Sequence, residues 1–188
     1  MPGARRILTH PHEALRRKAR PVERFGPSLV ALGDDLLATL YACGGLGIAA
    51  PQVDVGQRVI VVRGHPEARG LVLVNPEVRA RAGSSVLMEG CLSVPGAHHS
   101  IVRAGRVEVA ALDVRGRPLT LPLDGLLAHV FQHEFDHLDG VLFLDRAEPQ
   151  PPRATPEDFR KLEAVQTQLD TTASDLAAEA RALGLEDT

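Results

Sequence analysis

Residues His133, Glu134 and His137 form the pattern His-Glu-x-x-His, and this pattern most constrains how the 188-residue chain can fold. Residues four apart on an α-helix project from the same face, so the two imidazoles can bind one metal ion if this segment is helical. Glu134 can then reach a water molecule beside that ion. The alternative is a structural helix whose histidines are hydrogen-bonded in a core and whose glutamate faces solvent. The pattern favours a metal-dependent hydrolase.

A third metal ligand must come from elsewhere in the chain, because catalytic sites of this kind use three protein ligands and keep one position open. Residues 138–145 contain no His or Cys, whereas Cys91 lies upstream in segment 89–93, EGCLS. A thiolate there would complete a Cys-His-His site, although a single cysteine is also a common small core residue. Cys43, the second cysteine, fits no ligand position. We therefore expect free thiols or a metal ligand, not a disulfide.

Hydrophobic periodicity predicts a helix over residues 29–41 and a second one over residues 124–138, with Asp124 able to cap it and Gly140 able to end it. Between them, a glycine-rich loop with a short strand is expected at 43–52. Turns are expected at Gly83 and at Asn75-Pro76, among other positions. Six short strands are also predicted, at 58–62, 71–78, 86–89, 100–103, 107–113 and 119–123. This order of elements is typical of an α+β fold.

Beyond residue 147 the composition changes. Residues 148–156 are rich in proline and predict a stiff linker, and residues 157–183 carry an apolar stripe at helical spacing. Residues 157–187 contain eight acidic residues and three basic ones. The predicted organisation is a catalytic domain at 1–147, a linker at 148–156 and an acidic amphipathic helix at 157–183.

The charge balance excludes several classes of partner. A formal net charge of −3 and a pI near 6.2 give no basic surface for nucleic acid or an anionic membrane. The first residues contain no apolar run of signal-peptide or transmembrane length. We therefore expect a soluble, intracellular protein that binds neither DNA nor membrane.

Three segments together resemble the signature motifs of the peptide deformylase family, in the family's order and spacing. They are residues 45–52 (GLGIAAPQ), residues 89–93 (EGCLS) and residues 132–140 (QHEFDHLDG). The resemblance extends over about residues 5–145. It implies mostly antiparallel short strands packed around a central metal-binding helix, with an appended C-terminal helix. The implied activity is hydrolysis of the N-formyl group of N-formylmethionyl peptides, with release of formate.

The resemblance also implies roles for individual residues of the site. Cys91, His133 and His137 are expected to bind one divalent metal ion, which makes water a nucleophile near neutral pH. Glu134 is expected to take up a proton and deliver it to the leaving amine. As the carbonyl becomes tetrahedral its oxygen gains charge. The implied donors to that oxygen are the side-chain amide of Gln52 and the backbone N–H of Leu92.

Other residues match the family's substrate-binding positions. Glycines in the first motif let an extended peptide approach the backbone as an added strand. The expected peptide and side-chain contacts are Gly45, Leu46, Gly47, Leu126, Val130, His133 and His98. For Leu126, plain core packing is an equally good reading, and for Val130 it is an alternative. Glu89 and Arg103 match a supporting ion pair of the family.

Three residues have open assignments. His98 stands where many members of the family have an arginine that contacts the substrate, and it is otherwise an exposed loop residue. Asp136 and Asp139 are expected to cap or solvate the metal-binding helix, or to hydrogen-bond a ligand histidine.

The sequence leaves the metal open, because thiolate and imidazole ligands accept zinc, iron, nickel or cobalt. The resemblance favours Fe(II) in the cell. The expected partners are formylated nascent peptides and, transiently, the ribosome, although not through the acidic C-terminal helix. Two alternatives remain: a zincin-type metallopeptidase, which leaves Cys91 and Gln52 without a role, and a relic that binds formyl-peptides without turnover.

Overall fold

The computed structural model describes residues 3–147, and the linker and acidic helix predicted at 148–183 lie outside this range. Two α-helices, seven strands and three short 3₁₀ helices occur in the described part. They follow in the order η1 (Glu13–Arg16), α1 (Pro27–Cys43), β1 (Gly47–Ala49), η2 (Ala50–Val53), β2 (Val59–Val62), β3 (Leu71–Ala82), β4 (Ser85–Cys91), β5 (Val94–Arg103), β6 (Arg106–Leu112), β7 (Pro118–Asp124), α2 (Gly125–Leu138) and η3 (Phe143–Asp145).

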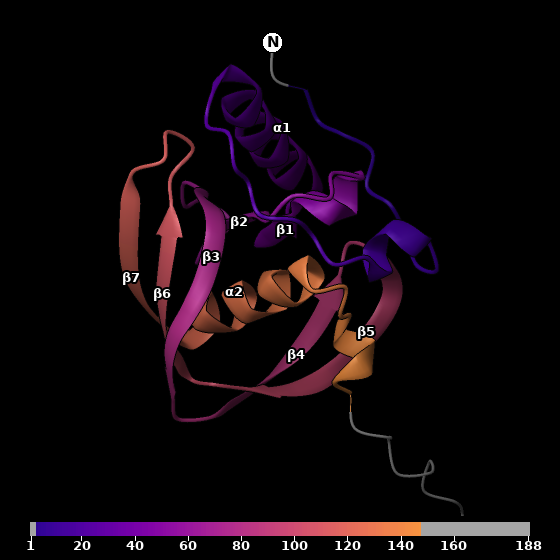
Figure 1. Cartoon of the computed structure of the whole chain (residues 1–188). Helices are drawn as coiled ribbons and strands as arrows, with labels where there is room; N and C mark the ends of the chain where they lie inside the picture. Colours follow the sequence, from indigo (N-terminus) through magenta and orange to yellow (C-terminus); the bar gives the residue numbers. More distant parts are fainter. Residues whose placement is uncertain (1–2, 148–188) are drawn as a thin grey trace, which may run out of the picture. The chain divides into compact units, whose positions relative to one another are not determined.

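The strands form two antiparallel sheets. One has five strands in the order β1-β2-β3-β6-β7, and the other consists of β4 and β5 alone. Figure 1 shows α2 in the centre, between the larger sheet and the β4–β5 pair, with α1 on the other side of β1 and β2. The predicted α+β class and the central position of the metal-motif helix are confirmed. No helix of residues 3–147 is long and apolar enough to cross a membrane.

Strand β2 explains how two helices share one sheet. All four of its residues are buried, so the strand has no solvent face. Val59 and Val61 pack in a cluster with the leucines of α1, whereas Ile60 packs with Phe131 of α2 on the opposite face. Burying each such side chain contributes about 1.5–3 kcal/mol. This packing fixes α2, and the site residues that it carries, against β1 and β2.

A third apolar cluster holds the β4–β5 sheet against the rest of the molecule. Ile101 of β5 packs with Leu15 of η1 and with Phe143 of η3, and all three side chains are fully buried. Cys91 is the last residue of β4, so this cluster also fixes the position of its thiol.

Helix boundaries agree with the prediction to within two residues. α1 begins at Pro27, whose missing N–H suits the first turn, and ends at Gly44 with φ 66°. α2 ends at Leu138, and Gly140 follows with φ 72°. Asp124 occupies the N-cap position of α2, but its side chain makes no capping hydrogen bond.

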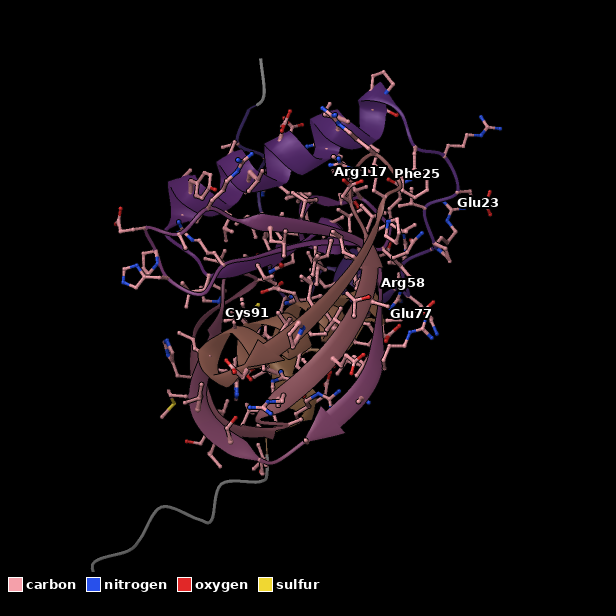
Figure 2. All side chains as sticks on the ribbon, turned by 90° about the vertical axis from the view of Figure 1, so that its left-hand side faces the viewer. Glu23, Phe25, Arg58, Glu77, Cys91 and Arg117 are labelled. Carbon is pink, nitrogen blue, oxygen red and sulfur yellow. The ribbon has the colours of Figure 1, made fainter. Side chains whose placement is uncertain are left out.

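The turn predicted at Asn75-Pro76 is wrong. Strand β3 continues through these residues with a bulge, and its pairing with β6 resumes at Glu77. Asn75 has φ 49°, and its amide exchanges two hydrogen bonds with the backbone of Val22, at 2.8 and 2.9 Å. A partner 53 residues away therefore stabilises a conformation that is typical of turns. Figure 2 shows Glu77 on the side of the molecule away from Cys91.

Candidate active site

Cys91, His133 and His137 converge on one point. Their Sγ and ring nitrogen atoms all lie within 4.8 Å of one another. The two histidines are one turn apart on α2, with ring centroids 5.1 Å apart, and Cys91 Sγ lies 3.2 Å from His137 Nε2. The helix supplies two ligand atoms on one face, and the end of β4 brings the third to it.

The chemistry of these three groups fits a divalent metal ion. Burial lowers the pKa of His137 well below its usual value, so this imidazole is neutral, as a metal ligand must be. Two N–H groups approach the sulfur: the backbone N–H of Ser93 at 3.4 Å and Gln52 Nε2 at 3.7 Å. The set of one thiolate and two imidazoles is typical of catalytic transition-metal sites.

Glu134 lies between the two histidines in sequence and is buried. Its Oε2 has no hydrogen-bond partner within the described part of the chain. Burial raises the pKa of Glu134 to about 7, although the nearby positive charges of His133, when it is protonated, and of Arg103 oppose this shift. A carboxyl group with this pKa can both accept and release a proton near neutral pH, as general acid-base catalysis requires.

Gln52 has a defined orientation. Its Oε1 accepts a hydrogen bond of 2.8 Å from the backbone N–H of Ala49, which can only donate, so the amide NH₂ must point the other way. There Nε2 donates to Ser93 Oγ at 3.0 Å and approaches Cys91 Sγ. The side chain is therefore aimed at the metal cluster before any ligand binds.

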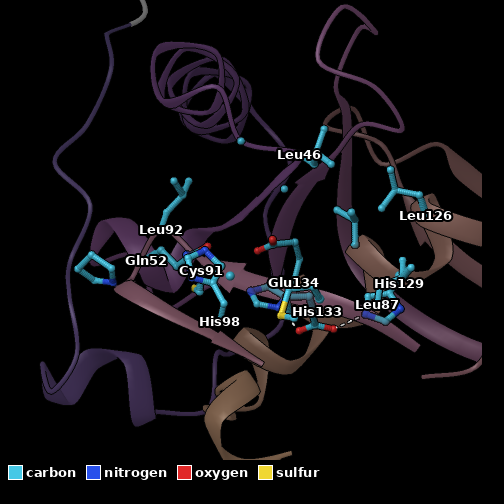
Figure 3. Close-up of a pocket in the computed structure, with 17 residues that line it drawn as sticks. Leu46, Gln52, Leu87, Cys91, Leu92, His98, Leu126, His129, His133 and Glu134 are labelled. Carbon is cyan, nitrogen blue, oxygen red and sulfur yellow. Dashed lines mark hydrogen bonds and ion pairs between the residues drawn. The ribbon is translucent and has the colours of Figure 1, made fainter. Parts of the chain in front are cut away.

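A cavity of about 620 Å³ opens beside the cluster. Figure 3 shows Leu46 and Leu126 on its walls, with Gln52, Cys91 and Glu134 deeper inside. All of the site residues named from the sequence line this cavity, with two exceptions. These are His137, whose Nε2 contacts Cys91 Sγ, and Arg103, which pairs with Glu89. The lining includes Gly45, Leu46, Gly47, Gln52, Glu89, Cys91, Leu92, His98, Leu126, Val130, His133 and Glu134.

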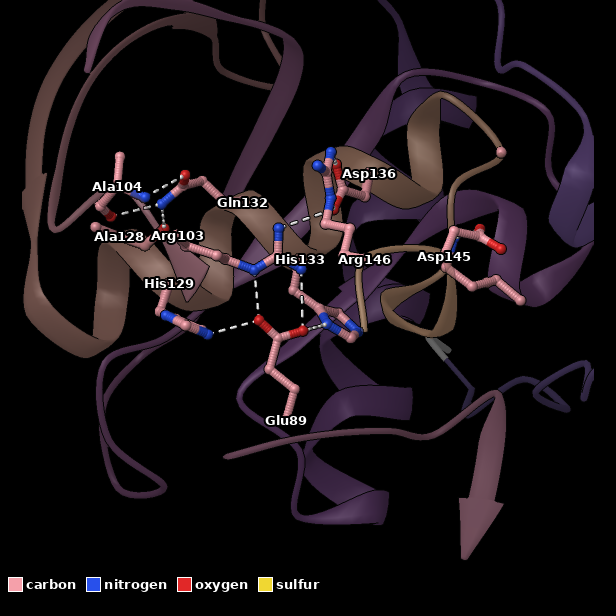
Figure 4. A network of polar contacts seen from close by, with 12 residues as sticks. Glu89, Arg103, Ala104, Ala128, His129, Gln132, His133, Asp136, Asp145 and Arg146 are labelled. Carbon is pink, nitrogen blue, oxygen red and sulfur yellow. Dashed lines mark hydrogen bonds and ion pairs between the residues drawn. The ribbon is translucent and has the colours of Figure 1, made fainter. Parts of the chain in front are cut away.

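Glu89 is the centre of a buried polar network (Figure 4). Its carboxylate accepts two hydrogen bonds from Arg103, contacts His133 Nδ1 at 2.7 Å and lies 2.5 Å from His129 Nε2. Burial raises the pKa of Glu89, but these contacts outweigh it and hold the pKa far below its ordinary value. Glu89 therefore stays ionised and orients the ring of His133, leaving Nε2 for the cluster.

The network continues to Asp136. Arg103 Nη1 donates to this carboxylate at 2.8 Å, and Arg146 donates to it through two nitrogens at 2.5 Å. Asp136 is buried, so it neither caps nor solvates α2, and its carboxylate contacts arginines instead of a ligand histidine. Asp139 is the C-cap residue of α2, which is one of the roles expected for it, and its side chain forms an ion pair with Arg58 at 2.8 Å.

Comparison with known protein families shows to which family this chain belongs. The family model described as polypeptide deformylase matches residues 4–153. The chain belongs to the polypeptide deformylase family. Its three motif segments lie around one cavity, which is the arrangement that deformylase chemistry requires of them.

Solved deformylase structures resemble this one closely. A peptide deformylase from Legionella pneumophila is 41% identical, with a TM-score of 0.76, and the match covers 88% of this chain and 98% of that one. A deformylase from Synechococcus elongatus, in complex with actinonin, is 40% identical at a TM-score of 0.75, covering 80% and 83%. A Met-Ala-Ser-bound deformylase from Acinetobacter baumannii is 35% identical at 0.73, covering 78% and 99%.

Sequence reasoning missed three residues of this deformylase site. The backbone N–H of Ser93 donates to the cysteine sulfur, and its hydroxyl oxygen accepts a hydrogen bond from the side-chain amide of Gln52. His129 lines the cavity and contacts Glu89, and Arg146 pairs with Asp136. Ser93 lies within the EGCLS segment, so its closeness to Cys91 was a usable signal. His129 precedes His133 by four residues and thus shares its helix face, which was a signal for a contact with the same partner.

Proposed function

We propose that this chain removes the formyl group from N-formylmethionyl peptides of nascent proteins and releases formate. The observation that carries this proposal is the convergence of Cys91, His133 and His137 beside a buried Glu134. Membership of the deformylase family supports it. A metal ion bound by these three residues would polarise the formyl carbonyl and lower the pKa of water toward neutrality.

Glu134 is proposed to move the proton. Its raised pKa of about 7 lets the carboxylate accept a proton from the attacking water and pass it to the amine that leaves. Its Oε2 has no other described partner, so the group is free for this task. A water molecule and the scissile nitrogen must then both approach Oε2.

Gln52 and Leu92 are proposed to stabilise the developing oxyanion. The amide NH₂ of Gln52 is held toward the cluster by Ala49, so little reorganisation is needed when charge develops. Leu92 directly follows Cys91 and lines the cavity. Removal of one such donor typically costs about 3–4 kcal/mol of transition-state stabilisation.

The apolar walls of the cavity are proposed to hold the methionine side chain. Leu46, Leu126 and Val130 supply apolar surface, and Gly45 and Gly47 expose backbone along the open edge of β1. An extended peptide can add to such an edge through main-chain hydrogen bonds. The Met-Ala-Ser peptide bound by the A. baumannii relative has the form expected of a product.

Several finer points of the proposal rest on chemistry or family likeness. Fe(II) is proposed as the metal in the cell, with zinc, nickel or cobalt able to occupy the same ligands. The enzyme is proposed to act in the bacterial cytoplasm, where nascent chains are made. Contact with the ribosome is proposed to be transient, because the acidic residues at 157–187 would be repelled by RNA phosphates.

The zincin alternative is disfavoured by Cys91 and Gln52. A zincin-type peptidase needs neither residue, yet Cys91 contacts His137 and Gln52 contacts Cys91. The relic alternative is disfavoured because Glu134, the residue whose loss would most directly abolish turnover, is present and buried in the site.

The test is formate release from formyl-Met-Ala-Ser by the protein and by its Glu134→Ala variant. The variant is expected to keep its bound metal and to lose at least about 100-fold in kcat, since Glu134 transfers protons without binding the metal. Acetyl-Met-Ala-Ser is the control substrate and should release no acetate. Turnover of Glu134→Ala within tenfold of the wild type would refute the assigned role.

A further inference from the structure

The outer face of the β4–β5 sheet is apolar and exposed. Side chains alternate along both strands, and Glu89 and Arg103 point inward. The outward residues pair across the strands as Val86 with Val102, Met88 with Ser100, and Gly90 with His98. None of these six is an Asp, Glu, Lys or Arg, although a solvated sheet face normally carries such residues.

Three of these side chains are among the most exposed large apolar groups of residues 3–147. The exposed fractions are 58% for Val86, 67% for Met88 and 59% for Val102. Because Val86 and Val102 are directly opposite each other, they form one patch and are not isolated residues. Contiguous exposed apolar surface of this kind usually marks a binding site.

The patch is continuous with the mouth of the cavity. Met88, Gly90 and His98 belong to the outer face and also line the cavity beside Cys91. A peptide whose first residue lies in the cavity can therefore leave over Gly90 and Met88 and reach the Val86–Val102 pair without crossing a charged side chain.

The distance along β4 from the cavity to the Val86–Val102 pair indicates which residues of the substrate would reach that pair. From Gly90 to Val86 the strand advances four residues, or roughly 13 Å at about 3.3 Å per residue. An extended peptide advances by the same amount per residue. The fourth to sixth residues of the substrate would lie over Val86 and Val102.

We propose that this outer face binds the downstream part of the nascent peptide and favours substrates with apolar side chains at positions four to six. This inference rests on the proposed deformylase function and extends it to longer substrates. The face adds a preference to the reaction, because a short formylated peptide occupies only the cavity and a longer chain also buries apolar surface on the sheet.

The experiment compares three formylated substrates: a formyl-Met tripeptide, an octapeptide with Leu or Val at positions four to six, and an octapeptide with Ser there. In the wild-type protein we expect kcat/KM for the apolar octapeptide to exceed that for the serine octapeptide by about fivefold, mainly through KM. The double variant Val86→Thr, Val102→Thr keeps the shape and β propensity of both residues. It should lose this preference and keep the tripeptide kinetics.

A variant with additional apolar surface tests the inference in the opposite direction. Ser100→Val adds apolar surface next to Met88 on the same face and should increase the preference for the apolar octapeptide. Equal kcat/KM for the two octapeptides in the wild type, or an unchanged preference in both variants, would overturn the inference. Tripeptide activity would still stand in that case, so the proposed function would be unaffected.

Other occupants of the face give different results. If a second copy covers the face, the double variant will shift the sedimentation coefficient toward that of a monomer without changing the octapeptide preference. If another segment of the chain covers it, the variant will lower the melting temperature and leave the preference unchanged. Either result contradicts peptide binding at this face.

Discussion

A Cβ atom on residue 47 would overlap the side chain of Glu134, lying 2.6 Å from its Cγ. Only glycine therefore leaves room for the carboxylate next to the backbone of β1. The same residue exposes its backbone at the sheet edge where the substrate is proposed to bind. Gly47 thus couples the position of the proton-transfer group to that of the peptide.

Gly47→Ala should displace Glu134 without touching the metal ligands. We expect kcat to fall about 100-fold, because a shift of about 1 Å in a catalytic group costs this much. Metal content should be unchanged. Gly56→Ala is the matched control, since a Cβ there would meet nothing within 4 Å. Wild-type kcat in Gly47→Ala would contradict the steric account.

Glu89→Gln tests the buried network. The substitution leaves the Arg103 guanidinium without one of its two carboxylates, and a broken buried pair typically costs about 3–5 kcal/mol of unfolding free energy. It also weakens the group that orients His133, which typically lowers metal affinity about 10- to 100-fold.

Thermal unfolding and a metal-competition titration measure the two effects of Glu89→Gln separately. Asp139→Asn is the control, because Asp139 pairs with Arg58, away from this network. A Glu89→Gln protein with wild-type melting temperature and metal affinity would show that the network is dispensable.

Arg63 holds the loop before β1. Its Nε donates to the carbonyl oxygen of Gly45 at 2.7 Å. Its backbone N–H donates to the carbonyl oxygen of Leu46 at 2.8 Å. The guanidinium is buried, and its Cζ lies 5.1 Å from the centre of the Tyr41 ring. These contacts fix the glycine backbone that lines the cavity.

Arg63→Lys should therefore raise KM for formylated peptides about fivefold and leave kcat within twofold, because it loosens peptide binding and not the chemistry. Tyr41→Phe keeps the ring under the guanidinium and should have a smaller effect. Steady-state kinetics on one substrate decide this, and a fall in kcat with constant KM would contradict the assignment.

The sequence predicted the parts of the site that lie within short segments. His133 and His137 were predictable because helical spacing alone places them together, and Cys91 because the EGCLS segment around it resembles a motif of the family. Arg63 was not predictable, since an arginine at a strand end resembles any surface arginine until the carbonyl of Gly45, 18 residues away, is placed beside it. Asp136 was expected to cap or solvate α2, or to hydrogen-bond a ligand histidine, and its real partners were not predictable because Arg103 and Arg146 come from other elements.

In the fold, too, features that depend on local sequence were predictable and features that depend on distant partners were not. Apolar and β-branched runs predicted a part of every strand from β2 to β7, because each pattern is local, but they missed the first six residues of β5 and the last four of β3. The continuation of β3 through Asn75-Pro76 depends on hydrogen bonds to Val22 and on pairing with β6, and no local pattern contains that information. Local propensity here favoured a turn, and tertiary contacts overrode it.

The ion pair between Arg16 and Asp145 should make the free energy of unfolding depend on pH in the acid range. Hydrogen bonding from Arg16 lowers the pKa of Asp145 below its ordinary value. The carboxylate therefore adds stability above the unfolded-state pKa of about 3.9, and this stability is lost as pH falls through the lower folded-state pKa.

Asp145→Asn should accordingly melt about 1–3 °C below the wild type at pH 7, a small difference because the pair is partly exposed. The amide oxygen can still accept the hydrogen bond from the Leu142 N–H, so the turn itself is preserved. Melting curves at pH 7 and at pH 3 should show that the difference becomes smaller in acid. A difference that grows at pH 3 would contradict the sign.

The central claim is that Cys91, together with His133 and His137, holds the metal that makes this chain a deformylase. The most direct measurement is anaerobic formate release from formyl-Met-Ala-Ser, with metal analysis of the same sample, for the wild type and for Cys91→Ala. We predict about one metal ion per active wild-type chain, one formate per free peptide amine, and loss of both metal and formate release in Cys91→Ala. Full activity and metal content in Cys91→Ala, or cleavage of internal peptide bonds without formate, would contradict it.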